Sequence, residues 1–231
     1  MLTLTQVKKS LFDLLFPPKC IGCGSGDGFL CPHCAESLPK LNPPYCVRCG
    51  RPAGGGGLCS QCIKLVAING IRSPFLYQGL AEEAVLQLKY RRLKALAEPL
   101  GQLLFEYLRS NPLPADVLVA VPLHPRRVRE RGYNQSFLLA RELSQLADLP
   151  VIDGSLVRLR DTASQVTITR AEERYANVKG AFSCRDGRFY GRHVLIVDDV
   201  CTTGATLDAC ASALKEAGAA SVWGLTLARE V

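Results

Sequence analysis

The hydrophobic residues of the chain change their spacing near residue 70. Beyond it, short uninterrupted apolar runs alternate with stretches in which apolar residues recur every three or four positions. The runs predict strands at 72–78, 116–122, 155–159, 193–197 and 221–228, and the periodic stretches predict helices at 80–90, 94–110, 135–147 and 204–217. Strands without polar alternation are covered on both faces, which predicts an α/β fold with a mainly parallel sheet.

The first 70 residues show no such alternation. We expect an amphipathic helix at 1–16, a cysteine-rich segment at 17–66 and the α/β domain at 70–231. Lys8, Lys9 and Asp13 interrupt the apolar residues at the start, which is not the pattern of a secretory signal, so the expected compartment is the cytoplasm. No apolar run approaches the ~18 residues that a membrane-spanning helix needs.

Composition narrows the class of protein only slightly. Of the 231 residues, 48% are hydrophobic and 21% charged, which excludes a disordered or collagen-like chain. The net charge of +7 permits contact with phosphate groups without demonstrating it. The informative feature is instead the placement of the cysteines, because eight of the eleven lie between positions 20 and 62.

These eight cysteines form four Cys-x-x-Cys pairs, and a glycine follows the first and third pairs, at Gly24 and Gly50. A disulfide framework is one interpretation, but a reducing compartment favours a metal site, and two such turns supply the four sulfurs of tetrahedral zinc. The repeat predicts two tandem zinc ribbons with two structural Zn²⁺ ions. Pairing in sequence gives the ligand sets Cys20, Cys23, Cys31, Cys34 and Cys46, Cys49, Cys59, Cys62; crossed pairing is the alternative.

One strand end carries a specific motif. The apolar run at 194–197 delivers Asp198 and Asp199, and a turn with Thr202, Thr203, Gly204, Ala205 and Thr206 then opens a helix. Free backbone N–H groups, threonine hydroxyls and the positive end of a helix suit a phosphate, and the two carboxylates suit a sugar diol or Mg²⁺. The motif therefore predicts a ribose 5-phosphate site, with both acids outside the core. The alternative is that the acids cap the helix.

This motif resembles the signature of the phosphoribosyltransferases, which binds 5-phosphoribosyl 1-pyrophosphate (PRPP). The paired Cys-x-x-Cys modules, the LKYRR segment, VLVAVPLHPRRVRERGYNQS at 117–136 and RLRDTASQVTITRAEERYANVKGAF at 158–182 are similar to those of the ComF-type competence proteins. The resemblance covers nearly the whole chain. It implies a double zinc ribbon followed by a type I phosphoribosyltransferase fold, with Mg²⁺ accompanying PRPP.

The resemblance also implies a role in natural transformation, with single-stranded DNA and other DNA-uptake proteins as partners. Two alternatives stay open: an active phosphoribosyltransferase of nucleotide metabolism that releases pyrophosphate, and a DNA-binding adaptor with a vestigial pocket. Transfer would use Asp198, Asp199 and Arg174, the last in the loop that covers the site in transferases of this fold. An ordinary helix at 169–177 is the alternative for Arg174, and no segment plainly binds an acceptor base.

Two further groups of polar residues are candidate ligand contacts. Arg131, Asn134 and Gln135 follow the strand at 116–122 and are expected to hold an anion, or else to cap the next helix and face water. The basic runs 89–94 and 126–131 adjoin Tyr90 and Tyr133, a combination that suits single-stranded DNA. The candidate DNA contacts are Lys89, Arg91, Arg92, Arg126, Arg127 and Arg129, and a solvated surface is the alternative.

Overall fold

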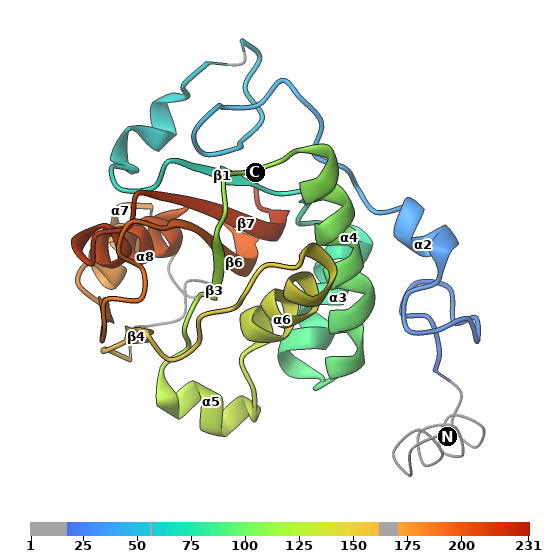
Figure 1. Cartoon of the computed structure of the whole chain (residues 1–231). Coiled ribbons are helices and arrows are strands. Elements are labelled where there is room, and N and C mark those ends of the chain that lie inside the picture. The colour runs from blue at the N-terminus through green and yellow to red at the C-terminus, as the bar shows by residue number, and fades with distance from the viewer. Residues whose placement is uncertain (1–17, 56, 162–170) are drawn as a thin grey trace.

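The computed structural model describes residues 18–55, 57–161 and 171–231 (Figure 1). The helix expected at 1–16 lies outside the described residues. Within the described part, no helix is both long enough and apolar enough to cross a lipid bilayer.

A parallel sheet forms the centre of the α/β domain. Its strands are β1 (Gly70–Arg72), β2 (Phe75–Leu76), β3 (Val117–Ala120), β6 (His193–Cys201) and β7 (Ser221–Arg229). They run in the order β1-β7-β6-β3, and β2 also pairs with β7. Every pair in this sheet is parallel, so the predicted architecture is confirmed.

Helices cover both faces of the sheet (Figure 1). One layer contains α3 (Gly79–Tyr90), α4 (Ala97–Ser110) and α6 (Gln135–Ala147), and the other α7 (Ala171–Val178) and α8 (Ala205–Glu216). Successive strand residues point to opposite faces. In β6, Leu195 and Val197 therefore join the core beneath the first layer, while Val194 and Ile196 join the core beneath α8.

Several elements differ from the sequence prediction. The strand expected at 72–78 is two short strands, β1 and β2, and β5 was not predicted. Helix α5 (Pro125–Arg131) was not predicted, because it buries none of its residues and so has no apolar periodicity. Strand β4 (Leu156–Arg158) does not join the main sheet but pairs antiparallel with β5 (Phe182–Cys184). The strand expected at 193–197 continues to Cys201, because its last residues still pair with β7.

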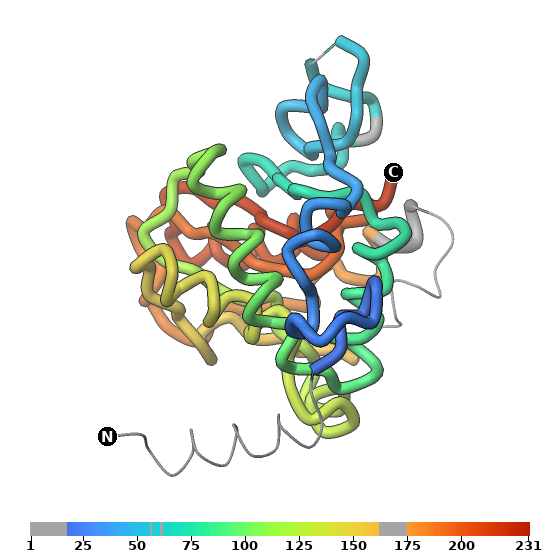
Figure 2. The backbone as a smooth tube through the Cα atoms, turned by 90° about the vertical axis from the view of Figure 1, so that its right-hand side faces the viewer, coloured from blue at the N-terminus to red at the C-terminus, as the bar shows by residue number. Residues whose placement is uncertain are grey.

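The two cysteine-rich modules form separate lobes (Figure 2). The first contains α2 (Pro32–Glu36), and its Leu30 and Leu38 pack in the core that also contains α3 and α4. The second contains the 3₁₀ helix η1 (Ser60–Lys64), and its Cys62 packs in the core beneath α8. The first module therefore packs against the layer of α3 and α4, and the second lies beside the edge strand β1, where Ile71 N–H donates to the Arg48 carbonyl at 2.7 Å (Figure 1).

Candidate functional site: a pocket at the carboxyl ends of the strands

A pocket of about 440 Å³ opens where β3, β6 and β7 end. This is the edge at which parallel α/β sheets bind ligands. The pocket is lined by both aspartates of the motif, by residues of the threonine-glycine turn and by residues of both basic runs. The full lining is Tyr77, Glu82, Leu86, Lys89, Tyr90, Val121, Leu123, Arg127, Arg131, Gln135, Arg158, Asp198, Asp199, Val200, Cys201, Thr202, Gly204, Ala205, Thr206, Leu207 and Glu230.

Asp198 and Asp199 enter the pocket from the extended end of β6. Ser136 Oγ donates a 2.7 Å hydrogen bond to Asp198 Oδ1, and Lys89 Nζ lies 2.6 Å from Asp199 Oδ1. The expectation that both acids lie outside the core was wrong for Asp199, which is only 3% exposed. It is buried because β6 continues past it, with Val200 paired to Ala228.

The two carboxylates have different electrostatic surroundings. Burial raises the pKa of Asp198 to about 7, and the neighbouring charge of Asp199 adds to the rise against the opposing effects of Ser136 and Lys89. Asp199 Oδ2 is buried and accepts no hydrogen bond from the described residues. A buried acceptor without a donor is costly, so a hydroxyl or cation entering the pocket would satisfy this atom.

The turn at 202–206, here called the phosphate loop, joins β6 to α8. Gly204 has φ +85° and ψ −2° at the N-cap of α8, a conformation that side chains disfavour. A Cβ there would also lie 2.9 Å from Ile71 Cδ1. The Thr203 hydroxyl accepts from Ala205 N–H at 3.3 Å, and the Tyr175 hydroxyl donates to the Thr203 carbonyl at 3.2 Å. These two hydrogen bonds fix the conformation of the loop at the N-terminus of α8, the end of a helix at which backbone N–H groups have no acceptor within the helix.

Arginines from two other elements complete the pocket. Arg127 and Arg131 come from α5, and Arg158 comes from β4; these three residues are called the basic wall. Burial lowers the pKa of Arg158, and the charge of Arg127 lowers it further. Because these cations repel one another, an anionic ligand that neutralises their charge would be favoured.

The three residues expected to bind an anion have different positions. Arg131 lines the pocket and donates to Gln135 Oε1, and Gln135 lines the pocket as well. Asn134 does not line it. Its side chain caps α6 by accepting from Ser136 N–H at 3.0 Å, and it donates to the Val121 carbonyl at 2.9 Å. Asn134 therefore has the alternative role that the sequence allowed, as the N-cap of α6.

The side chain of one predicted site residue is not described, and two residues that contribute to the site were not predicted. Arg174 belongs to α7, but the position of its side chain is not among those described. Arg158 lines the pocket but was not predicted as a site residue, because nothing in its local sequence marks a pocket arginine. Tyr175 was missed for the same reason, since its contact with Thr203 depends on the folding of two distant segments.

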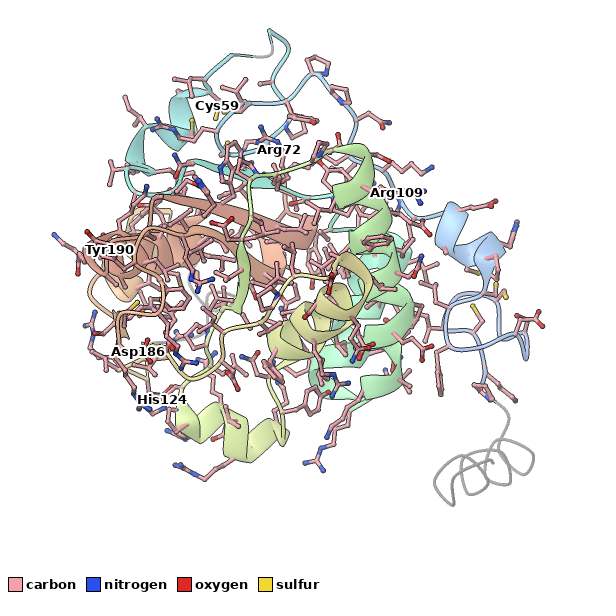
Figure 3. All side chains as sticks on the ribbon, in the orientation of Figure 1. Cys59, Arg72, Arg109, His124, Asp186 and Tyr190 are labelled. Carbon is pink, nitrogen blue, oxygen red and sulfur yellow. The ribbon has the colours of Figure 1, made fainter. Side chains whose placement is uncertain are left out.

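The two basic runs meet at the rim of the pocket. The Arg131 guanidinium lies 5.4 Å from the centre of the exposed Tyr90 ring. Arg126, Arg127 and His124 surround Asp161 at 3.6 to 3.8 Å, and His124 is the N-cap of α5 (Figure 3). Arg91, Arg92, Arg126 and Arg129 are exposed. Lys89 is not part of this surface, because its side chain is 17% exposed and ion-paired to Asp199 inside the pocket.

Each cysteine module gathers four thiols. The sulfur atoms of Cys20, Cys23, Cys31 and Cys34 lie within 4.8 Å of one another, and so do those of Cys46, Cys49, Cys59 and Cys62. Pairing in sequence is thus the observed arrangement. Cys23 and Cys31 sulfurs are 3.7 Å apart, far beyond a disulfide but close to the ~3.8 Å edge of a tetrahedron with Zn–S bonds of about 2.3 Å. Cys59, in the second module, is marked in Figure 3.

Backbone donors favour ionisation of the first thiol in each module, whereas burial raises the pKa of Cys34, Cys49 and Cys62. Burial opposes ionisation of Cys46, but backbone N–H groups of Cys49, Cys59 and Arg48 outweigh it, and the pKa of Cys46 falls to about 6. The Cys20 thiol, with equivalent donors, also has a pKa of about 6. Thiolate is the metal-binding form of cysteine, so the donor set fits structural zinc.

Comparison with known proteins agrees with this architecture. Residues 11–63 match the double zinc ribbon domain family, and residues 134–230 match the phosphoribosyl transferase domain family. The solved glutamine PRPP amidotransferase of Bacillus subtilis covers 56% of this chain at 21% identity with a TM-score of 0.39, a likeness too weak to add to the assignment.

Curated relatives match almost end to end. DNA utilization protein YhgH of Salmonella typhi is 34% identical over 206 residues, which cover 84% of this chain and 87% of the relative. Competence protein F of Haemophilus influenzae is 31% identical, with coverage of 86% and 90%. Competence protein ComFC of Bacillus subtilis is 29% identical, with coverage of 88% and 85%. With its two four-cysteine modules and its phosphoribosyltransferase fold, the chain belongs to the ComF-type family of competence and DNA utilization proteins.

Proposed function

We propose that the pocket binds PRPP or a closely related ribose phosphate, and that the protein uses this site while it handles single-stranded DNA during DNA uptake. The observation that carries the proposal is the combination of three chemistries in one pocket: the phosphate loop, the acids of β6 and the basic wall. A ligand with a diol between two phosphorylated ends matches all three.

Each part of PRPP has a counterpart. The N–H groups and hydroxyls of the phosphate loop suit the 5-phosphate, since the N-terminus of α8 adds a positive dipole. Asp199 Oδ2, which accepts no hydrogen bond from the part of the chain that the structure describes, is an acceptor for a ribose hydroxyl. The guanidinium groups of Arg127 and Arg131 suit the pyrophosphate, because arginine bonds phosphate in a bidentate manner.

Magnesium fits the same residues. Carboxylate oxygens and phosphate oxygens are the ligands that Mg²⁺ prefers, and the acids of β6 stand beside the proposed phosphate sites. When bound, the ion would neutralise pyrophosphate charge. Lys89 already neutralises part of the charge of Asp199, so we assign Mg²⁺ to the ligand complex and not to the free protein.

The DNA role rests on the family and on the rim of the pocket. Relatives are named for competence and DNA utilization, and Arg91, Arg92, Arg126 and Arg129 are exposed beside the aromatic ring of Tyr90. Arginine contacts phosphates while aromatic rings stack on bases, which favours single strands over duplex. The cytoplasm is the proposed compartment, and other DNA-uptake proteins are the proposed partners.

Transfer of the ribosyl group is a second candidate function. The observation that favours it is the basic wall, which would hold the pyrophosphate while a nucleophile forms a bond to C1 of the ribose and the C1–O bond breaks. Positioning and charge stabilisation would then supply most of the rate. Pyrophosphate release from PRPP, measured with a panel of bases, distinguishes this enzyme from a protein that only binds PRPP.

Calorimetry with PRPP and ribose 5-phosphate, each with and without Mg²⁺, tests the proposal. PRPP should bind more tightly than ribose 5-phosphate, and Arg131→Ala should weaken PRPP by about tenfold, the loss of a charge-assisted hydrogen bond, while leaving ribose 5-phosphate nearly unchanged. Arg109→Ala removes an exposed arginine from the last turn of α4 and is the matched control. Absence of binding to either ligand at millimolar concentration would refute the assignment.

A further inference from the structure

The two zinc ribbons share one backbone turn but carry different residues on it. The first turn closes with a hydrogen bond from Cys20 N–H to the Ser25 carbonyl at 2.8 Å, and the second with one from Cys46 N–H to the Arg51 carbonyl at 2.7 Å. Ser25 and Arg51 therefore occupy the same position of the repeat. A long cation replaces a short hydroxyl only in the second ribbon.

Arg51 uses its length to reach the phosphate loop. Its guanidinium donates to the Thr202 carbonyl at 3.2 Å. Arg229, at the end of β7 and only 1% exposed, donates to the same carbonyl at 3.5 Å and to the Cys201 sulfur at 2.9 Å. Two guanidinium groups, one from the ribbon and one from the sheet, thus hold the first peptide of the loop.

That peptide bears on phosphate binding. Across a trans peptide the carbonyl of one residue and the N–H of the next point in opposite directions. Holding the Thr202 carbonyl toward Arg51 and Arg229 therefore directs the Thr203 N–H to the opposite side of the loop. An N–H fixed in this way is a preorganised donor for an anion, and preorganisation is a main source of affinity.

The segment that follows the last zinc ligand also supports the loop. Leu65 and Ile71 side chains fill the space beside Gly204, where a Cβ would lie 3.2 Å and 2.9 Å from their methyl groups. Asp208, in the first turn of α8, accepts hydrogen bonds from Ala67 N–H at 2.9 Å and Ile68 N–H at 3.0 Å. The phosphate loop and the start of α8 thus rest on the second ribbon and the chain leaving it.

Charge links the arginines to the second metal centre as well. Arg51 Nε and Arg229 Nε are buried, and neither has an acceptor among the described residues. Arg51 also lies only two residues after Cys49, one of the four cysteines of the second module. A Zn²⁺ ion with four thiolates carries a net negative charge and would balance these two cations.

We propose that the second zinc centre sets the conformation of the phosphate loop through Arg51 and Arg229, so that metal at the second ribbon controls ribose-phosphate binding and metal at the first does not. The claim about ribose-phosphate binding rests on the function proposed above. The claim about the conformation of the phosphate loop does not, because it concerns the protein without ligand.

Substitutions at Arg51 test the link directly. Arg51→Ala should increase hydrogen exchange across residues 202–208 of the ligand-free protein and weaken PRPP by about tenfold, with two zinc ions retained and Arg51→Lys restoring part of both effects. Ser25→Ala is the control, because Ser25 occupies the position of Arg51 in the first ribbon and its hydroxyl accepts from Cys23 Sγ at 3.3 Å. Equal exchange in the Arg51→Ala and Ser25→Ala proteins would overturn the proposal.

A matched pair of ligand substitutions tests the role of the metal. Cys31→Ser and Cys59→Ser change the same position of the repeat, since each N–H donates to the first sulfur of its own module. Only Cys59→Ser should raise exchange at residues 202–208, and equal effects of the two would overturn the proposal. If Cys59→Ser fails to fold, the Arg51 comparison decides. If wild-type protein binds no PRPP, the proposed function fails, while exchange still decides the loop coupling.

Discussion

Lys89 and Asp199 form an ion pair of 2.6 Å that joins the last turn of α3 to the carboxyl end of β6. Burial lowers the pKa of Lys89, but the attraction of Asp199 and Asp198 outweighs it, so the net direction is upward. The ammonium therefore stays charged at neutral pH. Its place inside the pocket shows why a basic run in the sequence does not identify a surface: one lysine of the run faces inward.

Removing one partner of this pair should destabilise the fold. Lys89→Met leaves the Asp199 carboxylate buried without its cation, and we expect a loss of about 3 kcal/mol in the free energy of unfolding. Urea denaturation followed by circular dichroism measures it. The double variant Lys89→Met with Asp199→Asn should recover much of the loss, because no uncompensated charge remains. Equal stability of wild type and the single variant would contradict the role of the pair.

Ribose-phosphate binding should depend on pH through Asp198. The folded pKa of about 7 lies above the ordinary 3.8, so the carboxyl is protonated below neutral pH and ionises as pH rises. If the ionised form binds the ribose or Mg²⁺, PRPP affinity measured by calorimetry should rise between pH 6 and 8. Because the pKa of Asp198 is higher in the folded protein than in the unfolded chain, the stability that the protonated carboxyl contributes is lost as pH rises from about 4 through 7.

Asp198→Asn is the control for this pH dependence. It should remove the inflection near pH 7 and leave only the weaker dependence from the ligand's phosphates, whose second pKa is about 6. Zinc content must be equal at every pH, because the thiols of Cys20 and Cys46 also titrate near 6 when metal is absent. An unchanged inflection in Asp198→Asn would show that another group is responsible.

Local patterns predicted much of the fold and of the site. Uninterrupted apolar runs revealed the parallel strands, because a strand buried on both faces has no polar positions. The spacing of the cysteines was sufficient to predict the two four-thiol clusters, and the sequence from Asp198 to Thr206 was sufficient to predict the turn between β6 and α8. In each case the residues that act together are neighbours in the sequence.

Other features depend on contacts between distant segments, and local patterns could not reveal them. Helix α5 buries none of its residues, so its presence depends on the His124 cap, whose ring accepts from the Arg126 N–H, and on Pro125 at its first turn. Arg51 and Arg229 reach the same carbonyl from opposite ends of the chain. The local sequence around each arginine does not indicate that its side chain reaches the Thr202 carbonyl.

Purified protein should contain two zinc ions per chain, and a chelator should remove them in order. Cys23 of the first module is exposed, whereas Cys46, Cys49 and Cys62 of the second are at most 2% exposed. We therefore expect the first module to lose zinc faster and residues 20–34 to lose exchange protection before 46–62. Elemental analysis and a colorimetric chelator measure both quantities. If protein prepared under zinc-replete and reducing conditions contains no zinc, the assignment of these sites is contradicted.

Single-stranded DNA should bind weakly, without sequence preference, and less tightly as salt increases. Phosphate contacts release counterions, so replacing Arg126, Arg127 and Arg129 by alanine should weaken binding and flatten the salt dependence. Arg126 and Arg127 already lie 3.6 and 3.7 Å from Asp161. Because that carboxylate competes with DNA, we expect the slope to fall by about two, less than one unit for each arginine. Fluorescence anisotropy with a labelled oligonucleotide measures it.

A second triple variant separates local contact from total charge. Arg109, Arg185 and Arg192 are exposed and do not line the pocket, so changing all three to alanine lowers the net charge from +7 to +4 just as the first variant does. If the α5 arginines contact the strand, only their removal should flatten the salt slope, and PRPP should compete because the same helix lines the pocket. If both triple variants lose affinity equally, DNA responds to the overall charge alone. The run at 126–131 is then a solvated surface, and the DNA site lies elsewhere.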